Sequence, residues 1–358
     1  MNHYTKALSF FTAALHLIAG GANLVAAEPD EARWVLSTDM ATDVDDTAAI
    51  GMLIEAAKRG RGTIAACVSD APTRHGAPAL RAFLDAWGYE TVPVGAYQGY
   101  AGNPAEHAYP ARVAHQFGQA SLTRSDFPDS VSVLRRAYAE SPDHSVTFIA
   151  IGFLTTLDEL LQSPADEISP MTGRQLFEQK TRMVVSVGAN FTGNRDGSLR
   201  WNWKHAPEVT ARVINTMSRP FYWLPANEID QSGFPKDHPR RGAPPTVTGP
   251  EGFGWDSEEN PIQLAFEVCR SEEPEALTNG LRRKAFDPAA VRFATDFDLE
   301  LFDFYHRNIH LSIEDGSIQI DPERSGVFSI LRIRLPSRNG TPGNYLDNIL
   351  RHLPAPEQ

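Results

Sequence analysis

The sequence predicts an α/β protein with an open, mostly parallel sheet flanked by helices, a Rossmann-like architecture. Short apolar runs alternate with amphipathic segments through most of the chain, which is typical of strands connected by helices. The apolar runs are nearly continuous, as expected for strands that are buried on both faces. With 358 residues, 42% of them hydrophobic, the chain is long enough to form a large core.

The apolar runs predict strands at 33–38, 63–69, 92–96, 145–151, 182–187 and 220–224. The amphipathic segments predict helices at 45–58, 77–87, 131–140, 154–163, 206–217, 260–268 and 287–295. The chain closes with a predicted hairpin, "HLSIEDGSIQIDP", in which Asp315-Gly316 supplies the tight turn between two strands. We therefore expect a small C-terminal β appendage on the α/β domain.

Residues 1–27, "MNHYTKALSFFTAALHLIAGGANLVAA", predict a secretory signal peptide. They contain one Lys, no acidic residue and a long apolar middle, and they end in the small residues Val25-Ala26-Ala27. An N-terminal membrane anchor is the alternative, since the stretch could nearly span a bilayer. Cleavage would leave 28–358 as a single exported domain, periplasmic or secreted, with a Pro/Gly-rich loop excursion at 225–262.

The charge pattern argues against nucleic acid as a partner. The formal net charge is −12, and the Lys and Arg residues are scattered rather than clustered. Beyond the signal peptide no run is long and apolar enough to span a membrane, so no membrane partner is expected after cleavage. An exported chain permits a disulfide between Cys67 and Cys269, but Cys67 lies in an apolar run and is equally well explained as a small buried side chain.

Four aspartates, Asp39, Asp43, Asp45 and Asp46, are crowded into eight residues between the first predicted strand and the first predicted helix. Open α/β sheets bind ligands at the carboxyl ends of their strands, which is where this cluster lies. Capping of the helix N-terminus accounts for one or two of these carboxylates, but not for four. A hard cation requires several carboxylate oxygens at once, so the cluster predicts a metal site.

The segment "STDMATDVDDTAAIGML" resembles the signature of the nucleoside hydrolase family, the calcium-dependent N-ribohydrolases. It follows the longer form D-T-D-x-G-x-D-x-D-D, with Ser37 in place of the first Asp and Ala41 in place of the Gly. Three further segments resemble family motifs in the family's order, and the resemblance spans about residues 33–350. These segments are "VTFIAIGFLTTLDELL", "VGANFTGNRDGSLRWNWKHAPEVTARVI" and "RRKAFDPAAVRFA".

The resemblance implies an enzyme of nucleoside catabolism that hydrolyses the N-glycosidic bond of a ribonucleoside or related N-ribosyl compound. It implies a Ca²⁺ ion bound by three carboxylates and one backbone carbonyl, those of Asp39, Asp46, Asp287 and Thr155. It makes Asp39 the general base on a metal-bound water, and it assigns the ribose hydroxyls to Asp45, Asn194 and Asn202. Family members are often dimers or tetramers, so a homo-oligomer is compatible with it.

Two departures from the family pattern concern the far end of the pocket. Arg200 replaces the Glu that holds the 5′ end of the sugar, so it either receives an anionic group or turns to solvent. Phe286 replaces the His that protonates the leaving base in some members, and a phenyl ring cannot transfer a proton. Trp201 is a candidate for stacking on the base, as are Trp203 and Trp255. His205 and His238 are the nearest spare acids in the sequence.

Two other functions compete with this hypothesis. The sequence "DVDDT", residues 43–47, satisfies the D-x-D-x-T motif of haloacid dehalogenase-type phosphatases. In that class the first Asp directly follows a strand, whereas here the strand is expected to end at Thr38. The second alternative is a catalytically degenerate relative that binds calcium and a ribosyl ligand without turnover.

Overall fold

The computed structural model of the protein describes residues 32–102, 104–193, 196–230, 246–248, 256–277, 282–297, 299, 301–334 and 342–356. The predicted signal peptide and most of the predicted excursion at 225–262 lie outside these residues. In the described part, no helix is long and apolar enough to cross a bilayer. Cys67 and Cys269 are buried free thiols, and burial raises the pKa of each to about 12.

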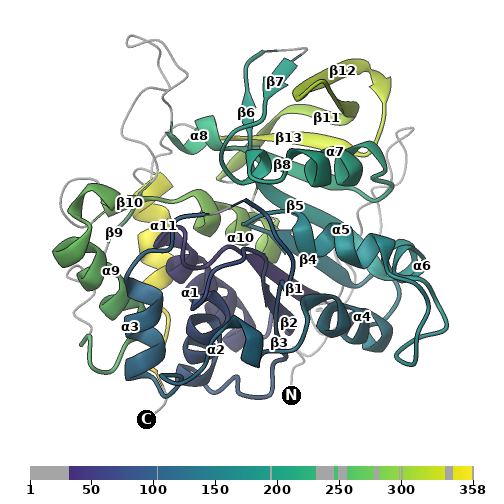
Figure 1. The fold of residues 1–358 in the computed structure, drawn as a ribbon. Helices are drawn as coiled ribbons and strands as arrows, with labels where there is room; N and C mark the ends of the chain where they lie inside the picture. Colours follow the sequence, from purple (N-terminus) through teal and green to yellow (C-terminus); the bar gives the residue numbers. More distant parts are fainter. Residues whose placement is uncertain are drawn as a thin grey trace, which may run out of the picture.

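The described strands form one eleven-stranded sheet and a separate two-stranded ribbon (Figure 1). Parallel strands make up most of the large sheet, in the order β3 (Val94–Ala96), β2 (Thr63–Ser69), β1 (Arg33–Thr38), β4 (Val146–Ala150), β5 (Thr181–Gly188), β8 (Phe221–Pro225) and β13 (Phe328–Ile333). The open, mostly parallel architecture predicted from the sequence is therefore confirmed.

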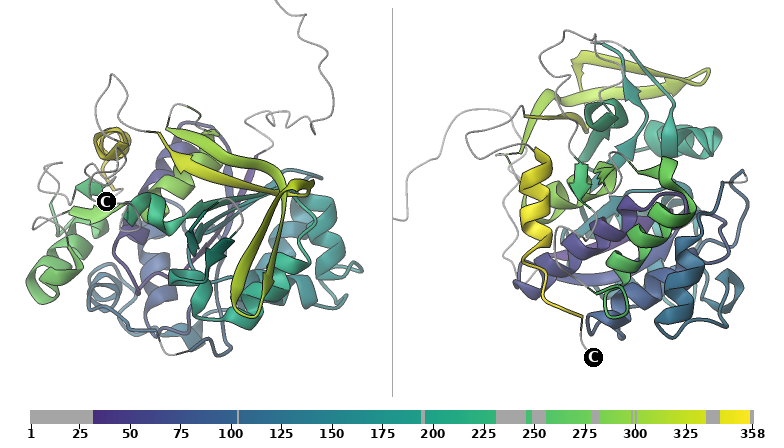
Figure 2. Two further views of the ribbon diagram at one scale, coloured as in Figure 1. Left: turned by 90° about the horizontal axis from the view of Figure 1, so that it is seen from above. Right: turned by 90° about the vertical axis from the view of Figure 1, so that its left-hand side faces the viewer.

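Antiparallel strands continue the sheet beyond β13 and gather at one end of the molecule (Figures 1 and 2). They follow in the order β11 (Phe302–Glu314), β12 (Ser317–Ser325), β7 (Asp196–Ser198) and β6 (Asn190–Phe191). β11 and β12 form the predicted hairpin, and its turn residues Asp315 and Gly316 have φ values of 50° and 75°. The ribbon pairs β9 (Thr246–Thr248) with β10 (Arg282–Lys284).

Helices cover both faces of the sheet. One face packs against α1 (Asp45–Lys58), α2 (Gly76–Ala86), α3 (Tyr109–Gln116), α9 (Pro261–Glu272), α10 (Phe286–Asp296) and α11 (Pro342–Leu350). The other packs against α4 (Ser130–Glu140), α5 (Thr155–Gln162), α6 (Gly173–Lys180) and α7 (Pro207–Asn215). Successive β1 residues point to opposite faces, with Trp34 and Leu36 in the first buried cluster and Val35 in the second.

The pairing of α1 with α10 positions the site. The two helices lie against each other on the same face of the sheet, although about 240 residues separate them in sequence (Figure 1). Both begin at the carboxyl edge of the parallel strands. The acidic residues in their first turns, Asp45 and Asp46 of α1 and Asp287 of α10, are therefore brought together.

Candidate active site

The aspartate loop, residues 39–46, connects β1 to α1 at the carboxyl edge of the sheet. The hydroxyl of Thr38, the last residue of β1, donates to Asp46. This bond draws the start of α1 over the end of the strand, and Asp45 and Asp46 are completely buried there. Asp39 is 5% exposed and reaches the surface of a cavity.

The carboxylate cluster consists of Asp45, Asp46 and Asp287, each of which has one oxygen within 4.8 Å of an oxygen of the other two. One Asp45 oxygen accepts from the backbone N–H groups of Phe286 and Asp287, at 2.8 and 3.2 Å, so the N-terminus of α10 holds it. The other Asp45 oxygen, Oδ1, and Oδ2 of Asp46 are buried with no hydrogen-bond partner among the described residues. Buried oxygens are normally satisfied, so the cluster could hold a metal ion.

The electrostatics of the carboxylate cluster also fit a cation. The pKa of Asp45, Asp46 and Asp287 lies well above its usual value, because burial removes water from the charged form and neighbouring carboxylates repel it. Burial raises the pKa of Asp39 to about 7. A divalent cation would stabilise all the ionised forms at once, because its charge offsets both burial and repulsion.

Asp43, for which the family resemblance implies no role, pairs with Arg283. The Arg283 Nε donates to Asp43 Oδ1 at 2.6 Å, and an Arg283 Nη contacts the second oxygen. Burial opposes the charge on Asp43, but the positive charge and hydrogen bonds of Arg283 outweigh it and lower the pKa of Asp43. Asp43 is therefore ionised, and the guanidinium group of Arg283 already balances its charge.

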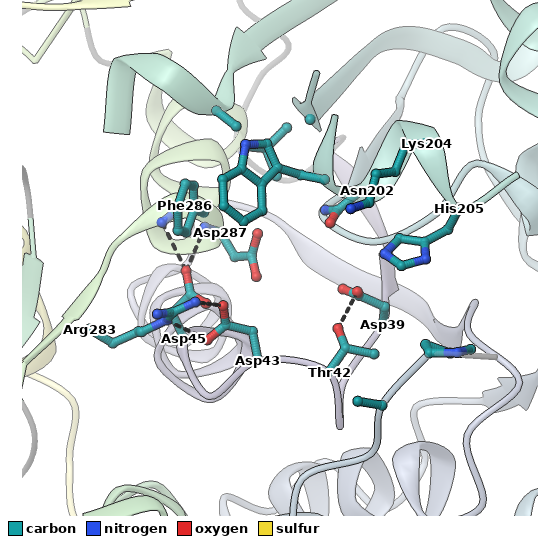
Figure 3. A pocket seen from close by; sticks show the side chains of 16 residues that line it. Asp39, Thr42, Asp43, Asp45, Asn202, Lys204, His205, Arg283, Phe286 and Asp287 are labelled. Atoms are coloured by element: carbon teal, nitrogen blue, oxygen red, sulfur yellow. Dashed lines mark hydrogen bonds and ion pairs between the residues drawn. The ribbon is translucent and has the colours of Figure 1, made fainter. Parts of the chain in front are cut away.

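A cavity of about 300 Å³ opens beside the aspartate loop (Figure 3). Asp43, Asp45 and Arg283 lie on one side of it, and Asp39 and Asn202 lie on the other. The lining consists of Asp39, Thr42, Asp43, Asp45, Pro104, Ala105, Val187, Gly188, Trp201, Asn202, Lys204, His205, Ala226, Arg283, Phe286 and Asp287. A pocket with several carboxylates, two aromatic rings and amide groups is suited to a small polar ligand that has one flat apolar part.

The aromatic part of the lining is formed by Trp201 and Phe286. Their ring centroids lie 5.8 Å apart with a 40° angle between the planes, and Trp201 is 43% exposed. Trp203 is instead buried in the core, where its Nε1 donates to Ser186 Oγ at 3.1 Å. Of the three tryptophans suggested by the sequence, Trp201 is the one in the cavity, and Trp255 lies outside the described residues.

The structure brings most of the sequence-predicted site residues to this cavity. Those in its lining are Asp39, Asp45, Trp201, Asn202 and Asp287. Asp46 lies in the carboxylate cluster behind them. Asn194 and His238 are outside the described residues. The catalytic and binding roles of all these residues remain predictions.

Thr155 and Arg200 are not part of the described lining. Thr155 begins α5 and is buried, with its hydroxyl donating to the Asp70 carbonyl at 2.7 Å. Arg200 is exposed, directly before the short helix η3 (Trp201–Lys204). Arg200 therefore makes no contact in the described lining that would support its binding of an anionic group.

Lys204 and His205 also line the cavity, and neither has an assigned role in the family resemblance. The His205 ring stacks on Phe153, with the centroids 4.7 Å apart and the planes 16° apart. Burial and the nearby Lys204 charge lower the pKa of His205, so its neutral form is favoured. The only sequence signal for this pair is its position directly after the "RWN" segment of the resemblance.

Asp70, at the carboxyl end of β2, supports the aspartate loop through hydrogen bonds to the neighbouring segments. It is completely buried, and its two oxygens accept from the Ser37 hydroxyl at 2.7 Å and the Phe153 N–H at 3.0 Å. Burial and the charge of Asp39 raise the pKa of Asp70. The end of a buried apolar run was the signal that could have identified it, as it did for Asp39.

Gly152 allows β1, β2 and the start of α5 to meet behind the cavity. A Cβ atom at this position would lie 2.3 Å from the Asp39 backbone nitrogen and 2.3 Å from Asp70 Oδ1, which is closer than any packed contact. We expect Gly152→Ala to lower the free energy of unfolding by about 1–3 kcal/mol and to reduce activity, because the aspartate loop must shift. Urea unfolding and a turnover assay measure the two effects. Gly193→Ala is the control for stability, since its Cβ would meet the nearest atom at 3.5 Å.

Tyr109 fixes the backbone of the aspartate loop. Its buried hydroxyl accepts from the Ala41 N–H at 3.1 Å and donates to the Asp43 carbonyl at 2.6 Å. Ala41 has a φ of 108°, which a side chain rarely adopts, so the loop is strained at the position where the resemblance expects Gly.

We expect Tyr109→Phe to cost about 1–3 kcal/mol of stability and to lower kcat about tenfold, because two backbone groups of the aspartate loop lose their partner. Thermal melts and initial rates measure these effects. Tyr138→Phe is the matched control, because Tyr138 is a buried tyrosine of α4 on the opposite face of the sheet. Equal losses of activity in both variants would assign Tyr109 to general packing only.

The fold and the site together define an α/β protein with a carboxylate-rich pocket at the carboxyl edge of its sheet. Its fold is that of the nucleoside hydrolases. A plant nucleoside hydrolase, PpNRh1, matches with a TM-score of 0.61 and 15% identity over 90% of this chain and 99% of that one. The inosine-uridine preferring nucleoside hydrolase from Bacillus anthracis matches with a TM-score of 0.60 and 13% identity over 90% and 99%.

The type III effector protein XopQ, solved in complex with adenosine diphosphate ribose, also has this fold. It matches with a TM-score of 0.56 and 12% identity over 92% of this chain and 94% of that one. No family model and no curated protein matches the sequence. At these identities the similarity establishes the fold, and function has to be argued from the site.

Proposed function

We propose that the protein hydrolyses the N-glycosidic bond of a ribonucleoside or a related N-ribosyl compound. The observation that carries this proposal is the carboxylate cluster, which has two unpartnered buried oxygens on one side of a ligand-sized cavity, with Asp39 on the other side. Capping of α1 does not explain it, because the N-terminus that satisfies an Asp45 oxygen is that of α10. The nucleoside hydrolase fold supports the same conclusion.

The proposed cofactor is Ca²⁺, bound by carboxylate oxygens of Asp39, Asp46 and Asp287 with the Thr155 carbonyl. When bound, such an ion lowers the pKa of a water molecule and holds sugar hydroxyls in place. Two members of this donor set, Asp46 and Asp287, support the proposal, because they lie in the carboxylate cluster and Oδ2 of Asp46 has no partner among the described residues. Calcium prefers several oxygen ligands of this kind.

The proposed role of Asp39 is to accept the proton of the attacking water. The hydroxyl of Thr42 already donates to one Asp39 oxygen, so the second oxygen is the proposed acceptor. Asp45 and Asn202 bind ribose hydroxyls in this proposal, and Trp201 with Phe286 contacts the flat leaving base. Burial of the carboxylates excludes bulk water from the sugar side of the cavity.

Binding without turnover is the second candidate function. The observation in its favour is Phe286, because it occupies the cavity where a proton donor for the leaving base would be expected. XopQ, which has the same fold, was solved with adenosine diphosphate ribose. An N-ribosyl nucleotide is therefore the ligand class to examine in this case.

The two candidates are separated by incubating the purified protein with a nucleoside panel, with calcium and with a chelator, and measuring reducing sugar. Calcium-dependent sugar release supports hydrolysis. Measurable calcium binding with no release from any nucleoside favours the binding protein. Release of phosphate from a model ester would instead support the phosphatase.

We further propose that the protein is exported after removal of residues 1–27. The composition of that segment and its small-residue end support this proposal. N-terminal sequencing of the mature protein should begin at Glu28, and retention of Met1 would contradict it.

A further inference from the structure

A second cavity, of about 370 Å³, lies near the carboxyl ends of β2 and β3, which are neighbouring strands in Figure 1. We call it the arginine groove. Its lining consists of Pro72, Arg74, Gln98, Thr123, Arg124 and Ser125. These residues come from the loops that follow β2 and β3 and from the short helix η2 (Arg124–Asp126) with its preceding residue.

One backbone hydrogen bond and one side-chain hydrogen bond hold the three segments of the arginine groove together. The Arg124 N–H donates to the Arg74 carbonyl at 2.9 Å. The Gln98 amide donates to the Arg124 carbonyl at 3.2 Å. Because each segment is tied to another, the backbones of the two arginines are held at the same cavity, and only their side chains need ordering when a ligand binds.

Neither arginine side chain of the groove has a hydrogen bond or an ion pair to a carboxylate in the part of the chain that the structure describes. Arg124 is half-buried, and its Nη1 atom is buried with no hydrogen-bond partner there. Arg74 is exposed. In a chain with a net charge of −12, two adjacent arginines without an acidic partner are unexpected.

The nearest carboxylates in sequence are used elsewhere. Glu106 accepts from the backbone N–H groups of Arg74 and His75, at 2.8 and 2.9 Å, and pairs with the His75 ring. Asp126 accepts from the N–H and hydroxyl of Thr123, at 2.8 and 2.9 Å, and so completes the capping box of η2. Both carboxylates therefore shape the loops rather than neutralise the guanidinium groups.

We propose that the arginine groove binds a phosphate group. Guanidinium groups match the oxygens of phosphate with paired, charge-assisted hydrogen bonds. The hydroxyl of Ser125 and the amide of Gln98 supply further polar groups in the lining.

The phosphate can belong to either of two kinds of ligand. Segment 104–106 contacts both the main cavity and the groove, since Pro104 and Ala105 line the main cavity and Glu106 binds the Arg74 backbone. A phosphate carried by the N-ribosyl ligand of the main cavity is one source, which rests on the proposed function. A separate phosphorylated molecule is the other. The binding of a phosphate group is common to both.

The test is calorimetric titration of the full-length protein with inorganic pyrophosphate in calcium-free buffer. We expect saturable binding that weakens about tenfold or more in Arg74→Gln and in Arg124→Gln, because each loses charge-assisted hydrogen bonds. Arg136→Gln is the control, since this exposed residue of α4 removes the same charge away from the groove. Arg74 is exposed, so Arg74→Gln tests the proposal even if Arg124→Gln does not fold.

Absence of saturable binding by the unmodified protein at about 10 mM pyrophosphate overturns the proposal. Equal weakening in Arg136→Gln overturns it too, because the effect would then be one of net charge. If the phosphate belongs to the substrate, Arg74→Gln raises KM for a nucleotide and leaves KM for the nucleoside unchanged. Unchanged KM for both, with pyrophosphate binding lost, identifies a separate ligand. The titration needs no turnover, so it stands even if the proposed hydrolysis fails.

Discussion

Replacing Asp39 with Ala is expected to lower turnover of a nucleoside substrate by about 10³-fold or more, because one change removes both a general base and a metal ligand. Asp39 has the properties that a general base and metal ligand require. It lines the cavity, it is 5% exposed, and burial raises its pKa to about 7. With a pKa in that range, Asp39 is ionised in a large fraction of the protein molecules near neutral pH.

Asp39→Asn separates the two roles of this residue. The amide keeps one oxygen that can contact a cation but cannot accept the proton, so we expect calcium to bind more weakly while turnover remains lost. Steady-state kinetics and calcium titration measure the two effects. Asp315→Asn, in the β11–β12 turn, removes the same charge far from the cavity and should retain full activity. Near-normal turnover by Asp39→Ala would contradict the mechanism.

The strand and helix pattern could be predicted from the sequence because both elements leave a local signal. The apolar runs that became β1 and β2 were located to the residue, since buried parallel strands read as continuous hydrophobic segments. Helices α3, α6 and α11 were not expected. Each is only eight or nine residues long, so it offers few turns over which a 3.6-residue period can be recognised.

Part of the candidate site could likewise be predicted from the sequence, and part could not. The aspartate loop was identified because its residues are adjacent in sequence, and Asp287 was identified by a motif. The partner of Asp43 could not be predicted, since Arg283 reaches it across 240 residues and pairing at that distance depends on how α10 packs against α1. The same holds for Tyr109, whose hydrogen bonds to the loop appear only in the folded chain.

Removing calcium is expected to destabilise the protein, and more so at higher pH. The pKa of Asp39 is raised from the ordinary value near 4 to about 7, so the folded ion-free protein retains a proton that the unfolded chain releases in this range. Its free energy of unfolding therefore falls as pH rises from about 4 to about 7. The raised pKa values of Asp45, Asp46 and Asp287 act in the same direction.

Bound calcium removes this dependence, because it favours the ionised carboxylates in the folded state. At a calcium concentration of about 100 times Kd the added stability is about 2.7 kcal/mol, or roughly 5 °C in Tm for a chain of this size. We expect the difference in Tm between calcium-loaded and chelated protein to be small near pH 5 and to reach that value above pH 7.

Asp46→Asn is the most direct test of this effect of calcium on Tm, because it removes one of the repelling charges without changing the size of the side chain. In chelator, the variant should melt at the same temperature as the unmodified protein or higher, since a buried, uncompensated carboxylate costs stability. Addition of calcium should raise its Tm by much less, while Asp315→Asn keeps the full response. If Asp46→Asn also keeps the full response to calcium, the carboxylate cluster is not the calcium site, and its unpartnered oxygens require another explanation.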